Sequence, residues 1–396
     1  MANPMNPVFI QQILAERPTQ TQILGPRIGE RWFPLEAQES YEYAWEVVSE
    51  YTPMAGLYDF QDKADTLGEL PSSRFITDIM HWGGRETINP KDAMWTRAEF
   101  DGPMGNINYG TGPFAESAQQ RDARMIAKKV RLMNEAIING LEYVRIQLMN
   151  GRIIWPPRQS NGTVIAEADL PRQFGQMEVD FDVDMLAADA VTLDCGFEQA
   201  ATTLVGKAGR AGTQVAWDQA GADAIVDLSR ITDLMAHRKS IDSSNLVMLM
   251  ARAILVEVSE QTTVLDRILG TSRDRQMVTI SETREAVLTL FDLAVEFYQS
   301  KWQYVNKSDW GKPRNEITIH SIPFMNEGTV LLLPNGPLGQ LITAPAPGPA
   351  YSWDTNLYYW YHEDLTPPWM RELGLGMWAW PIMLETDRHF IFKSRS

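Results

Sequence analysis

The sequence is poor in cysteine and has no long apolar run. Cys195 is the only cysteine among 396 residues, which excludes an intrachain disulfide framework and is typical of a reducing compartment. No run of about 18 uninterrupted apolar residues occurs, so we predict no membrane-spanning segment. Residues 1–22 lack both the basic start and the apolar centre of a signal peptide. We therefore expect the chain to stay in the cytoplasm of the cell that makes it.

Positive charge is also scarce. The chain has 35 Lys and Arg against 51 Asp and Glu, a formal net charge of −16. This balance argues against a dedicated nucleic-acid-binding protein, because contact with phosphates depends on basic patches that release counterions. Half of the acidic excess lies in residues 30–70, where ten acidic residues stand against two basic ones. An acidic chain can still lie beside DNA if it encloses the DNA without binding its sequence.

The sequence has no recognisable signature of a metal, nucleotide or nucleophile site. The histidines lie far apart, with no pair at the spacing of helical zinc ligands (His81, His237, His320, His362 and His389). Gly206 and Lys207 resemble the end of a phosphate-binding loop, but Ala208 follows where that motif needs Ser or Thr. No Gly-x-Ser-x-Gly elbow is present. We expect no cofactor, no metal and no catalytic residue.

One segment keeps an enzymatic interpretation open. Residues 351–364 combine a dense group of aromatic residues, including Trp353 and Trp360, with the carboxylates of Glu363 and Asp364. Sugar-processing sites use a pair of carboxylates, and aromatic platforms beside them hold the sugar. Aromatic residues at this density more commonly bury large areas in a core or an interface. A cytosolic carbohydrate-active enzyme is therefore the alternative from a different class.

The first third of the chain predicts a strand and then a long loop. Aromatic and β-branched residues alternate with Glu and Ala over residues 39–48, which favours a strand over the helix that the same residues also fit. Residues 53–114 are rich in Gly, Pro, Asn and Asp, with strand-like pieces only at 74–82 and 95–100. Compact domains rarely contain about 60 residues with so little core-forming pattern. We predict that this loop finds its partners on another molecule.

The clearest periodic segment, residues 116–150, predicts one long helix. Apolar residues recur at spacings of three and four and form a single face: Ile126, Val130, Met133, Ile137, Leu141, Val144 and Leu148. At about 1.5 Å per residue such a helix reaches about 50 Å. It is interpreted either as a rigid strut in a flat subunit or as an ordinary core helix with a solvated basic face.

The second half of the chain alternates helices with short apolar strands. Strands are predicted at 152–155, 162–167, 176–181, 246–250, 316–320 and 329–333. Helices are predicted at 222–237, 251–269 and 281–300. This alternation favours an α/β domain around one sheet. Residues from 344 onward are rich in proline and aromatics, and we expect them to fold against the earlier parts.

Several local sequences stand in an order that is found in one family. The first are the aromatic-proline sequence at 31–34 and the sequence Pro53, Met54 and Ala55 that opens the long loop. Trp217 and Asp218 then precede a helix at 223–228, with Ala224 where the family often has proline. A strand-like sequence at 245–248, an apolar strand at 328–334 and an acidic-proline turn at 364–368 follow. From about Arg31 onward, the chain resembles the lambda-type (E-type) major capsid proteins of tailed bacteriophages, which share the Hong Kong 97 capsid fold.

The resemblance implies an α+β fold with five parts. These are an N-terminal arm and first strand at 1–52, an extended E-loop at 53–115, a peripheral domain at 116–214 with a spine helix at about 116–150, an axial domain at 215–345, and a C-terminal segment at 346–396 that completes both domains. We expect five residues of the E-loop at subunit contacts: Trp82, Arg85, Lys91, Trp95 and Arg97. The seven apolar helix residues are expected to form the core of the spine.

The resemblance also implies a structural role without catalysis. The chain is expected to self-assemble into hexamers and pentamers of an icosahedral phage head that encloses double-stranded DNA, and to be assembled in the host cytoplasm and found in the virion. Expected partners are other copies of the chain, scaffolding and portal proteins, and a decoration protein. An encapsulin-like compartment shell, a tail-tube protein and other virion structural proteins are the alternatives within the same class.

Overall fold

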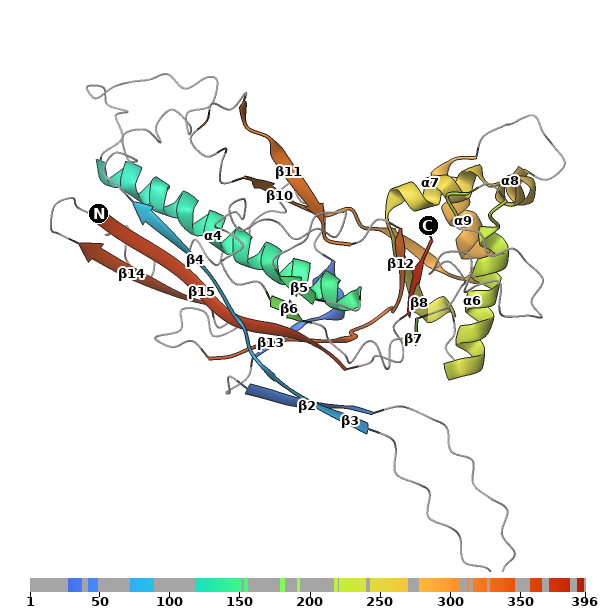
Figure 1. The fold of residues 1–396 in the computed structure, drawn as a ribbon, viewed down its shortest axis with the longest axis horizontal. Helices are drawn as coiled ribbons and strands as arrows, with labels where there is room; N and C mark the ends of the chain where they lie inside the picture. The colour runs from blue at the N-terminus through green and yellow to red at the C-terminus, as the bar shows by residue number, and fades with distance from the viewer. Residues whose placement is uncertain are drawn as a thin grey trace, which may run out of the picture.

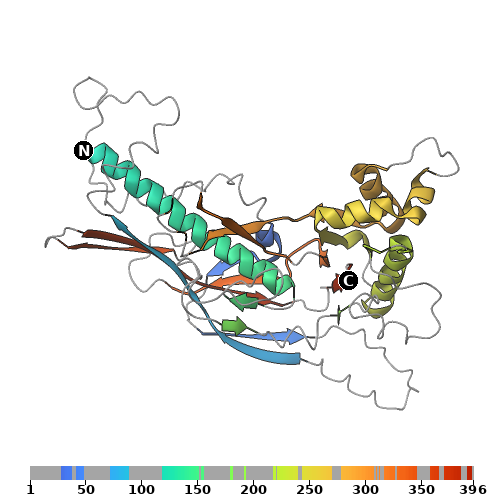
Figure 2. The ribbon, with the colours of Figure 1, turned by 45° about the horizontal axis from the view of Figure 1, so that its top comes forward.

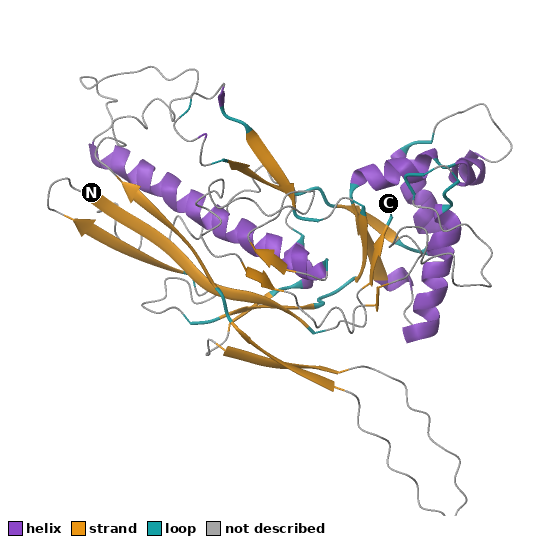
Figure 3. Ribbon diagram, in the orientation of Figure 1, coloured by secondary structure: helices purple, strands orange, loops and turns teal. Residues whose placement is uncertain are grey.

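The computed structural model describes residues 28–37, 42–48, 72–88, 118–150, 153–155, 179–181, 191–192, 217–219, 221–239, 243–269, 278–306, 309, 312, 316–325, 328–345, 357–364, 370–384 and 390–394. Helices and strands alternate along these residues, which gives a mixed α+β architecture (Figure 3). The ribbon forms two bodies side by side (Figure 1). One, here the sheet body, holds a long helix against a curved sheet, and the other, here the helical body, carries a group of shorter helices.

The sheet body is built on five strands in the order β1–β13–β15–β14, with β4 also paired to β15. Their bounds are Leu35–Ala37 (β1), His81–Ile88 (β4), Gly339–Thr343 (β13), Tyr358–Asp364 (β14) and Met370–Met383 (β15). The first half of β15 pairs antiparallel with both β14 and β4, and its second half pairs antiparallel with β13. Helix α4 (Ala118–Met149) lies across one face of this sheet, as two views show (Figures 1 and 2).

Helix α4 changes character along its length. Over residues 125–139, buried apolar residues alternate with exposed ones such as Arg131 and Leu132, as expected for a helix with one face on a sheet. Residues 140–149 are buried on every side, and they include the polar Glu142, Arg145 and Gln147. Buried polar side chains need hydrogen-bond partners. Those partners come from segments far away in the sequence.

The helical body contains a second five-stranded sheet in the order β7–β16–β12–β8–β9. Its strands are Val191–Thr192 (β7), Leu246–Met250 (β8), Ala294–Phe297 (β9), Thr329–Pro334 (β12) and Phe390–Lys393 (β16). Helices α6 (Ala224–Lys239), α7 (Arg252–Glu260), α8 (Thr262–Leu269) and α9 (Ile280–Phe291) pack against one another and against this sheet. The short turn η3 (Ser243–Asn245) leads into β8.

The central strands β8 and β12 are buried on both faces, which explains their uninterrupted apolar sequences. One set of their side chains joins the core of the helical body: Leu246, Met248, Met250, Val330 and Leu332. The intervening set joins the core of the sheet body: Leu249, Leu331 and Leu333. The two bodies therefore share one sheet as a common wall.

The remaining described elements are short helix α2 (Gly29–Trp32) and three antiparallel two-stranded ribbons. The ribbons are β2 (Glu42–Val48) with β3 (Ser72–Asp78), β5 (Ile153–Trp155) with β6 (Val179–Phe181), and β10 (Lys301–Val305) with β11 (Ile319–Pro323). In Figure 1 the β2–β3 ribbon lies outside both bodies, in line with β4.

Two predicted helices are corrected. The helix expected at 281–300 ends at Phe291, because Asp292 adopts a left-handed backbone (φ 54°) and donates its N–H to the Leu288 carbonyl; the apolar residues that follow form β9. The helix expected at 251–269 is two helices separated by Gln261, which has an extended backbone. Its side chain accepts the Ala224 N–H and donates to the Trp217 carbonyl. The break at Gln261 thus positions the start of α6.

Strand assignments also differ from expectation in places. Strands β8 and β12 lie where the apolar runs predict them, and β2 confirms the strand preferred for residues 39–48. Within the expected loop 53–114, β3 overlaps the strand-like piece predicted at 74–82, but β4 extends beyond it and is a fully paired strand of the sheet body. The strands expected at 95–100 and 162–167 lie outside the described residues. Strand β13, assigned by sequence to the axial part, belongs to the sheet body.

Candidate assembly surfaces

The β2–β3 ribbon is the first candidate assembly surface. Seven residue pairs join its strands, from Glu42 with Asp78 to Val48 with Ser72, and no other described strand pairs with either. A two-stranded ribbon alone is marginally stable in water, because it has no third strand or helix to cover it. Its base is anchored, since Ile79 between β3 and β4 is buried in the sheet body. An anchored ribbon with free edges can accept a strand from another chain.

Of the five residues predicted at subunit contacts, the structure describes two, Trp82 and Arg85. Lys91, Trp95 and Arg97 lie outside the described residues. Trp82 and Arg85 are in β4 rather than in a loop, and their side chains point to opposite faces of the sheet. Trp82 packs on Gly140 of α4 and donates its indole N–H to the Ala379 carbonyl (2.8 Å), so it is a packing residue of its own chain. Arg85 is exposed on the outer face, 4.0 Å from Glu372.

The outer face of β4, β15 and β14 carries an aromatic group on a floor of glycines. His81 Nε2 lies 2.6 Å from the Tyr358 hydroxyl, and the His81 ring is 4.9 Å from that of Trp378. Partial burial lowers the pKa of His81. The rings of Trp360 and Tyr358 lie over Gly374 and Gly376, where any side chain would overlap them. Trp360 is still 38% exposed, so the face is aromatic, shallow and open to solvent.

This arrangement bears on the enzymatic alternative. Tyr358 and Trp360 rest on the glycines of β15 and so act as packing residues of the sheet. Glu363 and Asp364 follow them in β14, but the placement of both side chains lies outside the description. Among the described residues, no three His, Cys, Asp or Glu side chains are grouped to hold a metal ion. None of the described helices is long and apolar enough to cross a membrane.

The seven apolar residues predicted for the spine core lie in α4, and all are at most 5% exposed. Met133 packs beneath Gly84 of β4. Near the end of α4, Tyr143 packs edge-on against Phe324, with ring centroids 5.5 Å apart. Gln147 donates to the Phe324 carbonyl at 2.7 Å. The helix is therefore fixed to both the sheet and the segment after β11.

Glu142 forms a buried polar junction at the inner half of α4. Its Oε1 accepts the backbone N–H groups of Ile28 (2.9 Å) and Gly29 (3.0 Å), the start of α2, and lies 3.3 Å from the Tyr298 hydroxyl. Arg145, one helical turn on, places Nη1 3.9 Å from Glu142 and 3.8 Å from Glu30. Burial raises the pKa of Glu142, while the Gly29 N–H and the Arg145 charge oppose that rise.

Helix α2 also contacts the helical body. Arg31 donates to Glu296 of β9 at 2.8 Å and to the Asn335 side chain. The Trp32 indole N–H donates to the Pro334 carbonyl (2.8 Å), and the Trp32 carbonyl accepts the Leu338 N–H (2.9 Å). One turn of helix thus joins α4 to the ends of β9 and β12. Sequence reasoning missed this junction, although the polar residues within the apolar run 141–149 were a signal for it.

Comparison with known proteins gives a structural likeness only. No family model matches the sequence, and no curated protein matches it. A prophage protein from Escherichia coli CFT073 assigned as a capsid protein superposes with a TM-score of 0.51 at 12% identity, covering 98% of this chain and 99% of that one. A phage-related protein from Bordetella bronchiseptica RB50 gives a TM-score of 0.44 at 9% identity, with 100% and 98% covered. The mature capsid of bacteriophage PhiM1 gives 0.41 at 11% identity, with 96% and 90% covered.

The class of fold follows from these observations. The chain is an α+β protein in which a long helix crosses a mixed sheet and a second sheet carries a layer of helices. It shares this fold, over nearly the whole of both chains, with the prophage protein of E. coli CFT073.

Proposed function

We propose that this chain is a major capsid protein of a tailed bacteriophage, which self-assembles into the hexamers and pentamers of an icosahedral head around double-stranded DNA. The observation that carries the proposal is the β2–β3 ribbon, which is anchored in the sheet body and has no third strand among the described residues. Such a ribbon can pair with a strand of another copy of the chain. The shared fold with the prophage protein supports the same conclusion.

The proposed layout follows the Hong Kong 97 capsid fold. The β2–β3 ribbon serves as the E-loop, α4 as the spine helix, the sheet body as the peripheral domain and the helical body as the axial domain. The net charge of −16 is consistent with enclosing DNA without sequence-specific binding. The role is structural and needs no cofactor. Scaffolding and portal proteins are the further partners proposed for such a head, and a decoration protein is an additional candidate.

The test compares assembly of the purified wild type with that of a variant without the ribbon. Replacing residues 43–77 by Asn-Gly joins the paired Glu42 and Asp78 through a two-residue turn and leaves β4 intact. The matched control replaces residues 49–71 by Asn-Gly between the paired Val48 and Ser72, which shortens the chain but keeps both strands. Circular dichroism checks folding, and light scattering with electron microscopy measures assembly.

The wild type and the control are expected to form shells, rings of five or six subunits, or regular sheets, whereas the ribbonless variant stays a folded monomer. If the ribbonless variant forms the same particles, the ribbon is not one of the assembly contacts. A wild type that stays monomeric at high concentration and in the presence of crowding agents would contradict the capsid function itself.

A further inference from the structure

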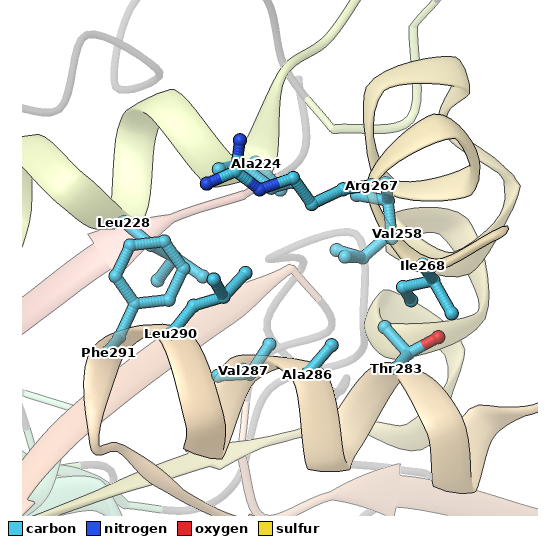
Figure 4. A pocket seen from close by; sticks show the side chains of 12 residues that line it. Ala224, Leu228, Val258, Arg267, Ile268, Thr283, Ala286, Val287, Leu290 and Phe291 are labelled. Atoms are coloured by element: carbon cyan, nitrogen blue, oxygen red, sulfur yellow. The ribbon is translucent and has the colours of Figure 1, made fainter. Parts of the chain in front are cut away.

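The helical body has a narrow apolar depression between its helices (Figure 4). Leu228 of α6, Val258 of α7, Ile268 of α8 and Phe291 of α9 are among the residues that line it. Arg267 of α8 extends across it toward α6. Arg267 is exposed and forms no ion pair with any residue in the part of the chain that the structure describes. A cation over an apolar floor is suited to a ligand that combines an apolar group with an acidic one.

The opposite side of α9 carries such a combination. Leu288 is 47% exposed, and it lies one helical turn from both Glu285 and Asp292, which are exposed too. A single exposed leucine is ordinary on a protein surface. Here the leucine is flanked by two carboxylates, and the same helix contributes Val287 and Phe291 to the wall of the depression.

We propose that copies of this chain contact one another head to tail through these two surfaces. Leu288 of one copy enters the depression of the next, and Glu285 of the first pairs with Arg267 of the second. The depression is too narrow for a leucine while Arg267 lies across it, so Arg267 rotates toward the incoming carboxylate and opens it. This inference rests on the proposed shell function and specifies one of its contacts.

The proposed contact has a defined symmetry. Leu288 is turned by about 100° from Val287 around the axis of α9, so the inserted side chain and the receiving depression lie on different sides of one helix. A two-fold contact would make the insertion twice between the same two copies and stop at a dimer, whereas a heterologous contact makes it once and continues to a third copy. The proposal is the heterologous contact, which is the type that closes into rings.

Disulfide crosslinking tests the contact directly. In a Cys195→Ser background, the double variant Leu288→Cys/Ile268→Cys carries one thiol on the inserted helix face and one in the depression of every copy. Mild oxidation of assembled particles is expected to give a ladder of covalent oligomers on denaturing gels, whereas each single variant stays monomeric. Covalent dimers from Leu288→Cys alone would show a two-fold contact and overturn the proposal.

The same experiment separates this inference from the proposed function. Particles that form normally but give no ladder would refute the Leu288 contact and leave the capsid function standing. Absence of particles from the wild type would refute both.

Charge exchange provides a second test in the native chain. Leu288→Asp should raise the concentration for half-assembly by about tenfold, the factor expected when burial of one leucine is lost. Arg267→Glu should also raise it, because it places two carboxylates against each other at the contact. Arg267→Glu combined with Glu285→Arg should recover assembly. Thr289→Asp is the matched control, because it adds the same charge to α9 about 100° away from Leu288 and should assemble as the wild type does. Equal loss in this control, or no recovery in the exchanged pair, would contradict the proposal.

Discussion

Replacing Gly140 by alanine tests how closely α4 approaches β4. In an exposed helix interior this change stabilises by about 1 kcal/mol, because glycine has the greater conformational freedom when unfolded. Here the new Cβ would lie 2.9 Å from the Trp82 ring, and overpacking of this kind costs about 1–3 kcal/mol. The ring cannot easily move aside, because its N–H is bonded to the Ala379 carbonyl. We therefore expect a net destabilisation of about 1 kcal/mol, the difference between these terms.

The measurement is urea unfolding followed by circular dichroism, at protein concentrations below assembly. In a Trp82→Leu background the ring is gone, so Gly140→Ala should now stabilise by about 1 kcal/mol. The double-mutant cycle should show a coupling of about 2 kcal/mol, within the range for residues in contact. Gly336→Ala is the control, since a Cβ there meets nothing within 4 Å. If Gly140→Ala stabilises the wild type as much as the Trp82→Leu variant, the close packing is refuted.

Two further changes have defined outcomes. Burial raises the folded-state pKa of Glu142 above its ordinary 4.5, so the stability linked to this proton is fully present below pH 4.5 and is lost as the pH rises through the raised value. Glu142→Gln removes this titration, so unfolding measured from pH 4 upward should show the wild type losing stability relative to the variant, and parallel profiles would contradict the junction. Thr279 accepts the Glu282 N–H in a capping box at the start of α9, so Thr279→Ala should cost about 1 kcal/mol. The exposed Thr289→Ala on the same helix serves as the control, and equal losses would show that the cap contributes nothing.

Sequence patterns predicted a helix or strand best where all of its apolar residues face a buried core. The runs that form β8 and β12 are apolar throughout because both faces are buried, and α4 follows from spacings of three and four. Strand β4 escaped prediction because Gly83 and Gly84 weaken the strand pattern. Gly83 is explained by a contact from elsewhere in the chain, because a Cβ there would lie 3.0 Å from the Leu375 carbonyl oxygen of β15.

The candidate site was less predictable than the fold, for a related reason. Glu142 occupies a helix position that looks solvated in sequence, and it is buried by α2 from more than one hundred positions away. Trp82 was expected at a subunit contact of the E-loop, at the end of the strand-like piece 74–82, whereas in the structure it lies in β4 and pairs with Met377 of β15. Leu288 and Arg267 became notable only when four helices were placed around a depression. Long-range packing determines each of these roles, and local periodicity carries no information on it.

The position of β16 has a consequence for the timing of folding during synthesis. This strand, residues 390–393, pairs with β12, which in turn pairs with β8 at residues 246–250. At ordinary rates of translation the ribosome needs roughly ten to thirty seconds to pass from β8 to β16. During that interval β12 lacks one of its two partner strands, and Ile391 is missing from the core of the sheet body. An unpaired strand edge favours aggregation of incomplete chains, so nascent chains on neighbouring ribosomes are most exposed to wrong contacts before β16 is made.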